Sequence, residues 1–138
     1  MNNESFHLVI LTPYGKYFEG DATFLEVHSE DYNLGILPNH SPLISTLAIS
    51  KMVLRTLEGE KKFAIGGGVI NIEKDKTTLL LDSIEQDSEI DTNRAYQAKL
   101  RAEERLKKST SDESIDVNRA KASLARALNR LNISGYNH

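Results

Sequence analysis

The chain has 138 residues and a formal net charge of −3, with four histidines and no cysteine. The lack of cysteine excludes disulfides and thiolate metal sites, and the scattered histidines give no metal-ligand spacing. The weak negative charge gives no overall reason to expect nucleic acid or an anionic membrane as a partner. No apolar run approaches the length needed to cross a bilayer, and the polar start at residues 1–5 is not a signal peptide, so we expect a soluble protein.

The first part of the chain, residues 1–84, is predicted to form a β-sandwich domain. Short runs of β-branched and aromatic residues alternate with Gly, Pro or polar turns. That pattern is typical of an antiparallel sandwich or flattened barrel of about eight to ten short strands. In the third strand, Leu25 and Val27 should face the core, and Glu26 and His28 should lie on the opposite face. The expected strands are 6–11, 16–19, 22–29, 50–57, 61–65, 69–73 and 77–82.

A triple glycine at 66–68 could suggest a phosphate-binding loop, because glycine-rich loops expose backbone N–H groups to anions. No Lys-Ser or Lys-Thr pair follows it, and predicted strands lie on both sides. We therefore interpret the triple glycine as a bulge or a close backbone approach within the sheet.

The segment 33–47 contains two prolines four residues apart, Pro38 and Pro42. Proline disfavours both helix and regular ladder bonding, so we expect an ordered loop at one end of the sandwich. The apolar residues around the prolines make this loop part core and part adhesive surface. His40 and Ser41 are not a nucleophile and base pair, because neighbouring side chains in an extended loop point apart, and we interpret His40 as a structural histidine.

The composition changes at residues 85–95, after which helix-favouring Ala, Arg, Lys, Glu and Leu dominate. Residues 85–90 are predicted to be a linker and residues 91–138 a two-helix domain. The first helix can begin at Ser88, in an approximate capping box with Asp91, or one turn later, where Asp91 and Thr92 offer a second cap. Small and apolar residues recur every three or four positions on both helices, which predicts a closely packed but weakly held hairpin. These residues are Ala95, Ala98, Ala102 and Leu106, and then Val117, Ala120, Leu124, Ala127, Leu128 and Leu131.

The second predicted helix has no acidic residue after Asp116. Arg119, Arg126 and Arg130 are spaced seven and four residues apart and share one face. This face is either a solvated surface with cations near a helix C-terminus, or a docking surface for acidic groups or phosphate. A nucleic-acid role is poorly supported because no aromatic residues accompany the arginines.

Three motifs together resemble the epsilon subunit of bacterial F-type ATP synthases. They are Leu-Gly-Ile-Leu-Pro-Asn-His-Ser-Pro-Leu at 34–43, Gly-Gly-Gly-Val-Ile at 66–70, and Ile-Asp-Thr-Asn-Arg-Ala at 90–95. The resemblance covers the whole chain in the same order. This sequence departs from the family at Tyr32, where members usually carry Gly, and at Asn33, where an acidic residue is common.

The resemblance implies a non-catalytic subunit that sits peripherally at the cytoplasmic face of the bacterial cell membrane and meets the membrane only through the complex. It implies that the sandwich binds the gamma subunit and rests on the c-ring. It also implies that the helices regulate ATP hydrolysis by reaching the catalytic beta (and alpha) subunits, with Arg119, Arg126 and Arg130 as the inhibitory basic face. The candidate residues of the contact loop for the c-ring and gamma are Asn33, Gly35, Ile36, Leu37, Pro38, His40 and Pro42.

No cofactor is required by this function, but the resemblance implies ATP as a possible regulatory ligand that is bound without hydrolysis. The chemistry suits arginines, which can contact phosphate oxygens in a forked geometry. Such a site requires a folded hairpin, because its members lie about 35 residues apart. The matching positions are Glu85, Ile90, Asp91, Arg94, Ala95, Arg126 and Arg130.

Two other classes of function are alternatives. An enzyme would need a nucleophile, a paired acid and base, or a metal site, and the sequence offers none of these patterns. A protein-interaction adaptor unrelated to the synthase would share the sandwich and the helical arm but show no preference for gamma.

Overall fold

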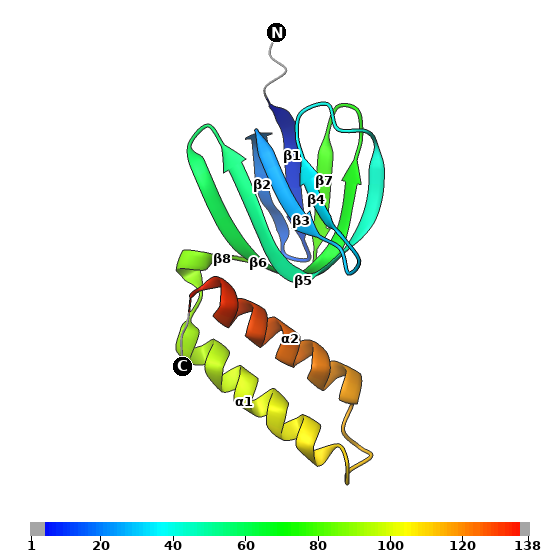
Figure 1. Cartoon of the computed structure of the whole chain (residues 1–138), viewed down its shortest axis with the longest axis vertical. Helices are drawn as coiled ribbons and strands as arrows, with labels where there is room; N and C mark the ends of the chain where they lie inside the picture. Colours follow the sequence, from blue (N-terminus) through cyan, green and yellow to red (C-terminus); the bar gives the residue numbers. More distant parts are fainter. Residues whose placement is uncertain (1–4, 136–138) are drawn as a thin grey trace. The chain divides into compact units, whose positions relative to one another are not determined.

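The computed structural model describes residues 5–135. The first four residues, and residues 136–138 of the predicted two-helix domain, lie outside this range. The chain divides into two compact units after Gln86, drawn as strands and as a helical hairpin in Figure 1. Each unit is described by itself below.

The first unit contains the strands, which form one 8-stranded sheet. This confirms the predicted all-β fold of the N-terminal part. The strands are β1 (Phe6–Thr12), β2 (Gly15–Ala22), β3 (Phe24–His28), β4 (Asn33–Ile36), β5 (Leu43–Thr56), β6 (Gly59–Ile72), β7 (Thr77–Leu81) and β8 (Ile84–Gln86).

The sheet follows the strand order β2-β1-β7-β6-β5-β3-β4, and β8 pairs with β6. All pairs are antiparallel except β1 with β7, which is parallel. The prediction of a purely antiparallel sheet is therefore wrong at this one pair. Two adjacent parallel strands must be joined by a crossover connection. The long β5–β6 hairpin is part of the connection between β1 and β7.

Strands β5 and β6 are each 14 residues long and curve through the unit (Figure 1). One half of this hairpin pairs with β7 and the other half with β3 and β8. The sequence predicts two shorter strands, 61–65 and 69–73, where β6 is continuous. That prediction is wrong because the triple glycine lies inside the strand and lets it bend, instead of ending it.

The triple glycine makes the close backbone approach that the sequence predicts. A Cβ on Gly68 would collide with the carbonyl oxygen of Leu80, and a Cβ on Gly66 would collide with Ser83 Oγ. Gly67 has φ 92° and Gly68 φ 154°, in the region that favours glycine. These glycines therefore serve packing within the sheet and do not form an anion-binding loop.

The core of the sandwich is formed by inward side chains from both halves of the folded sheet. Leu25 and Val27 are fully buried, whereas Glu26 and His28 are partly exposed, which confirms the predicted alternation in β3. The central buried residues are Leu8, Ile10, Leu25, Val27, Ile36, Met52, Leu54, Phe63, Ile65, Ile70, Ile72, Leu79 and Leu81.

Two predictions about irregular segments need correction. The proline-containing loop is shorter than 33–47, because Asn33–Ile36 pairs with β3 and Leu43 begins β5. Both prolines lie outside these strands. Strand hydrogen bonding is therefore interrupted only between residues 37 and 42. The expected linker at 85–90 is also structured, since it contains the end of β8 and a short 3-10 helix, Asp87–Glu89.

The second unit is an antiparallel pair of helices, α1 (Thr92–Lys108) and α2 (Val117–Ile133). The predicted small-residue seam is present: Ala95 and Ala102 of α1, and Ala120, Ala127 and Leu131 of α2, are buried. Val117 and Leu128 are 37% and 44% exposed and do not belong to the buried seam. Within residues 5–135, neither helix is long and apolar enough to cross a bilayer.

Candidate functional site

The loop between β4 and β5 is held by its own hydrogen bonds. The N–H of His40 donates to the carbonyl oxygen of Leu37 at 3.2 Å, and His40 Nδ1 lies 2.6 Å from the carbonyl oxygen of Ser41. Between them, Asn39 adopts φ 69°, a conformation that asparagine tolerates better than most residues. His40 thus bonds to the backbone, as expected of a structural histidine.

The predicted contact residues of this region do not all face solvent. Leu37 is 58% exposed, whereas its neighbour Ile36 is 1% exposed and belongs to the sandwich core. Asn33 and Gly35 lie in β4. The prediction of Ile36 as a contact residue is therefore wrong, because its side chain packs in the sandwich core and is not available to a partner.

The two departures from the family pattern are both accommodated locally. Asn39 is the positive-φ residue among the non-glycine residues described, so the backbone at Tyr32 does not need glycine. The hydroxyl of Tyr32 lies 2.9 Å from Ser45 Oγ. The side-chain oxygen of Asn33 accepts a hydrogen bond from His28 Nδ1 at 2.5 Å, which ties β4 to β3.

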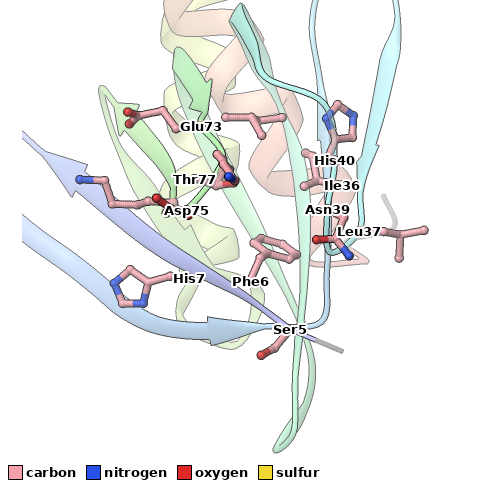
Figure 2. A pocket seen from close by; sticks show the side chains of 13 residues that line it. Ser5, Phe6, His7, Ile36, Leu37, Asn39, His40, Glu73, Asp75 and Thr77 are labelled. Atoms are coloured by element: carbon pink, nitrogen blue, oxygen red, sulfur yellow. The ribbon is translucent and has the colours of Figure 1, made fainter. Parts of the chain in front are cut away.

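A polar pocket of about 160 Å³ opens beside this loop (Figure 2). One wall is formed by the loop residues Leu37, Asn39 and His40, and the rest by the start of β1 and the turn between β6 and β7. The turn contributes both carboxylates and lysines. Its full lining is Ser5, Phe6, His7, Ile36, Leu37, Asn39, His40 and residues 72–77.

An apolar, open hollow of about 500 Å³ lies where the loop joins β5. It is lined by Pro42, Leu43 and Ile44 together with residues 71–74. Ile44 is 71% exposed, which is unusual for a large aliphatic side chain in a strand. This hollow is an exposed apolar surface where the loop joins β5, the kind of feature that marks an interaction site.

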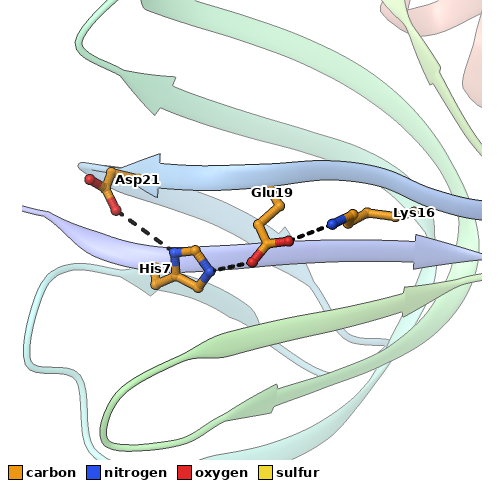
Figure 3. A network of polar contacts seen from close by, with 4 residues as sticks. All are labelled: His7, Lys16, Glu19 and Asp21. Atoms are coloured by element: carbon orange, nitrogen blue, oxygen red, sulfur yellow. Dashed lines mark hydrogen bonds and ion pairs between the residues drawn. The ribbon is translucent and has the colours of Figure 1, made fainter.

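A network of polar side chains covers the outer surface of β1 and β2 (Figure 3). Glu19 accepts a hydrogen bond from Lys16 Nζ at 2.6 Å and lies 2.8 Å from His7 Nε2. The hydrogen bond from Lys16, and then the one from His7, lower the pKa of Glu19 below its ordinary value. Asp21 lies 3.9 Å from His7 Nδ1. These groups are exposed, so the network organises a surface without forming a buried reactive site.

Four of the predicted nucleotide-binding residues, Ile90, Asp91, Arg94 and Ala95, lie at the start of α1. Asp91 is the N-cap of α1, and its carboxylate accepts a hydrogen bond from the backbone N–H of Arg94 at 3.1 Å. Ile90 and Ala95 are buried, so they shape this end of the hairpin. The Arg94 side chain is exposed.

The last turns of α2 lie at the same end of the antiparallel hairpin as the first turn of α1 (Figure 1). Arg126 and Arg130 are therefore brought toward Arg94, although they are far apart in sequence. Arg126 Nη2 donates to Ser123 Oγ at 3.2 Å, and both α2 arginines are half-buried. Glu85 belongs to β8 in the first unit, so it is described apart from these residues.

The described residues contain no group of side chains that could form a metal site. Within residues 5–135, no three His, Asp or Glu side chains are grouped so that they could hold a metal ion. The notable positive groups of the second unit are arginines, whose forked N–H groups suit carboxylates and phosphates. Arg101 and Arg105 of α1 do not stand out in the sequence, because acids and lysines lie between and beside them.

Comparison with known proteins identifies the class of protein that combines these two units. The family model described as "ATP synthase, Delta/Epsilon chain, beta-sandwich domain" matches residues 5–87. The model described as "ATP synthase, Delta/Epsilon chain, long alpha-helix domain" matches residues 88–135. Both units are therefore those of ATP synthase delta/epsilon chains.

Two curated relatives make the assignment more specific. The ATP synthase epsilon chain of Alkalihalophilus pseudofirmus is 40% identical over 91% of this chain and 94% of its own length. The ATP synthase epsilon chain of Halalkalibacterium halodurans is 39% identical over 95% of this chain and 98% of its own length. The chain belongs to the epsilon-chain family of ATP synthases, whose members are non-catalytic subunits.

Solved structures share the fold at lower sequence identity. A chain in the mitochondrial ATP synthase of Euglena gracilis (OSCP/F1/c-ring) has a TM-score of 0.75 at 16% identity, covering 88% of this chain and 76% of that one. A chain in the central stalk and c-ring of the Tetrahymena thermophila mitochondrial ATP synthase has a TM-score of 0.55 at 14% identity, covering 64% and 72%. The family assignment excludes the alternative of an adaptor unrelated to the synthase.

Proposed function

We propose that this chain is the central-stalk epsilon subunit of an F-type ATP synthase, where it couples rotation of the c-ring to the catalytic head through gamma and regulates ATP hydrolysis. The observation that carries the proposal is the match of both units, nearly end to end, to relatives named ATP synthase epsilon chain. A subunit with this role meets the cytoplasmic face of the bacterial membrane only through its complex.

The sandwich is the anchoring unit in this proposal. Its loop carries the exposed apolar side chain of Leu37, and the exposed Ile44 lines the open hollow at Pro42. Burial of apolar surface is worth about 25 cal/mol per Å², so this end can hold a partner without any charge pairing. We assign the loop end to the c-ring and leave the strand surfaces for gamma.

The hairpin is the regulatory unit. Its seam is lined mainly by alanines, which bury little area per residue, so packing holds the two helices together only weakly. A weakly held hairpin can change between a compact and an extended form. In the extended form, Arg119, Arg126 and Arg130 would reach acidic segments of the catalytic beta subunits and obstruct ATP hydrolysis.

ATP is the proposed ligand that favours the compact form. Asp91, Arg94, Arg126 and Arg130 lie at one end of the folded hairpin, and extension would separate them. A ligand present at about 100 times its dissociation constant stabilises the form that binds it by roughly 2.7 kcal/mol. That contribution is large enough to shift an equilibrium between forms that differ by a few kcal/mol.

Binding to gamma tests the assignment to the central stalk. Immobilised gamma subunit should retain the full chain and also a chain that ends at Asp87, because the sandwich is the anchor. ATP titration of the full chain and of Arg126→Ala tests the regulatory site. If Arg126→Ala changed neither ATP affinity nor the compaction of the hairpin, the nucleotide part of the proposal would be wrong. Failure of both chains to bind gamma would contradict the stalk assignment.

A further inference from the structure

The two helices of the hairpin repeat one another at a constant spacing of 25 residues. The repeat begins before the helices and continues past their ends, and it includes every arginine of both helices. The identical pairs are Ile90 and Ile115, Asp91 and Asp116, Asn93 and Asn118, Arg94 and Arg119, Ala95 and Ala120, Arg101 and Arg126, Ala102 and Ala127, Arg105 and Arg130, Leu106 and Leu131, and Ser109 and Ser134.

The repeat is structural as well as sequential. Asp91 caps α1 through a 3.1 Å hydrogen bond from the N–H of Arg94, and Asp116 caps α2 through a 3.0 Å hydrogen bond from the N–H of Arg119. Both helices are 17 residues long. Each ends at a serine whose hydroxyl donates to the carbonyl oxygen three residues earlier, at 2.6 Å for Ser109 and 3.1 Å for Ser134. The two helices therefore have the same boundaries and the same caps.

An antiparallel pair of equivalent helices has an approximate twofold axis perpendicular to the plane that contains both helices. Rotation about that axis exchanges α1 with α2 and exchanges the open end of the hairpin with its turn end (Figure 1). It also leaves each face of the hairpin on the same side. The buried alanines obey this symmetry, because Ala95 and Ala102 are buried on α1 and their counterparts Ala120 and Ala127 on α2.

The symmetry places a copy of the proposed nucleotide site at the turn end. Each hairpin residue of that site has an identical counterpart: Ile115 for Ile90, Asp116 for Asp91, Arg119 for Arg94, Ala120 for Ala95, Arg101 for Arg126, and Arg105 for Arg130. Glu85, which lies in the first unit, has no such counterpart, because Thr110 stands at that spacing.

The charges at the turn end also suit an anion. The arginine rows of α1 and α2 fall on the same face of the hairpin by symmetry. Within the helices neither row contains an acid, and Asp116 caps α2 at the turn end. The two helices hold only two acidic residues, Glu103 and Glu104, and Glu104 lies 3.7 Å from Lys108. Arg101, Arg105 and Arg119 are exposed, and three such guanidinium groups can bind several phosphate oxygens.

We propose that Arg101, Arg105 and Arg119 form a second site, at the turn end of the hairpin, for an anion that carries two or more phosphate groups. This inference rests on the proposed function, because it assigns to the turn end the chemistry proposed for the open end. Its ligand is a nucleoside triphosphate or an inorganic polyphosphate. Occupation of both ends would hold the two helices together more firmly than occupation of one.

The second site differs from the first in ways that weaken it. Arg126 is half-buried and donates to Ser123, whereas its counterpart Arg101 is exposed and has Ala98 at the position that corresponds to Ser123. Asp112 and Glu113 add negative charge in the turn. Exposed charge pairs are more strongly screened by solvent than half-buried ones, so we expect the turn-end affinity to be about tenfold weaker.

Equilibrium dialysis of the full chain against ATP tests the proposal. We expect two bound ATP molecules, with Arg119→Ala losing the weaker site and Arg126→Ala losing the tighter one. Arg101→Ala provides a second variant of the turn-end site. Lys121→Ala is the matched control, because it removes one positive charge from the opposite flank of α2 and should leave both sites. Circular dichroism of each variant establishes that the helices are intact.

The outcomes separate the inference from the function on which it rests. One bound ATP that Arg126→Ala abolishes and Arg119→Ala leaves unchanged would overturn the second site and keep the regulatory site. Weak binding that survives in Arg119→Ala and Arg101→Ala would also overturn it, as non-specific association. If the full chain bound no ATP, both the second site and the proposed regulatory site would be contradicted. Tripolyphosphate that displaces ATP from the weaker site supports recognition of phosphate, and displacement by adenosine would contradict it.

Discussion

The carboxylate of Asp91 accepts a hydrogen bond from the backbone N–H of Arg94 at 3.1 Å, which joins the acid and the first arginine of the proposed nucleotide site in one turn of α1. This contact fixes the position of Asp91 by a helix cap and leaves the guanidinium of Arg94 exposed. Asp91 therefore has a structural role as a helix cap and a proposed role in nucleotide binding. Substitutions can separate the two roles.

Substitution of Asp91 should distinguish these two roles. Asp91→Ala removes the cap and should destabilise α1 by about 0.5–2 kcal/mol, seen as lower helix content by circular dichroism. Asp91→Asn keeps the cap, because asparagine is an equally good N-cap, but it removes the negative charge. We expect the Asn variant to keep its helix content and to bind ATP more weakly. Asp116→Ala is the matched control for cap loss, and equal ATP affinity in the Asn variant and the natural chain would contradict a direct role for the carboxylate.

Gly68 should not tolerate a side chain. A Cβ at this position would collide with the Leu80 carbonyl oxygen, and φ is 154°. Overpacking typically costs about 1–3 kcal/mol, so Gly68→Ala should lower the midpoint of urea unfolding of the sandwich. Gly35→Ala is the control, because its Cβ would lie 3.4 Å from Phe24 Cε1, an ordinary contact. Equal urea midpoints for the two variants would contradict this prediction, because they would show that the backbone near Gly68 can move to accommodate a side chain.

Adjacent loop residues should have opposite effects. Ile36→Ala opens a cavity in the core and should destabilise the sandwich by about 2–5 kcal/mol. Leu37→Ala removes an exposed side chain, so it should leave stability almost unchanged and weaken binding to the isolated c-ring. Urea unfolding and c-ring co-sedimentation measure the two effects. A Leu37→Ala variant with full c-ring binding would argue against the loop end as the ring contact.

The network around Glu19 predicts a pH-dependent contribution to stability. Hydrogen bonds from Lys16 and His7 lower the pKa of Glu19, so they stabilise the fold above the pKa of an unfolded glutamate. This contribution is lost as the pH falls through the lowered pKa. Lys16→Met should raise the pKa of Glu19 toward its ordinary value, measured by NMR titration of the carboxyl carbon. Lys107→Met on α1 is the control, and an unchanged Glu19 pKa in Lys16→Met would contradict the assigned cause.

The sequence alone predicted much of the fold because its local signals are consistent. Alternation in β3 identified Leu25 and Val27 as core residues, and Asp91 marked the start of α1. The prediction failed where tertiary packing overrides local signals. Glycines usually end strands, but Gly66–Gly68 lie inside β6 because the backbone of the neighbouring chain segment approaches too closely for a side chain.

The candidate site was predictable in part. The α2 arginines stood out because no acid accompanies them, whereas Arg101 and Arg105 are interspersed with acids and lysines in the sequence. The 25-residue repeat that relates them to Arg126 and Arg130 can be read in the sequence, and the shared boundaries of the two helices show that the related arginines occupy equivalent helical positions. The core position of Ile36 was also not predictable, since proline-rich segments carry no periodicity that separates an inward from an outward side chain.

The most direct test of the proposed function is ATP hydrolysis by a catalytic head depleted of its epsilon subunit, titrated with the full chain and with a chain that ends at Asp87. We expect both chains to bind the head and only the full chain to slow hydrolysis, because the sandwich is the anchor and the helices are the inhibitory element. Binding of both chains without inhibition would contradict the regulatory role. Failure of both chains to bind would contradict the central-stalk assignment itself.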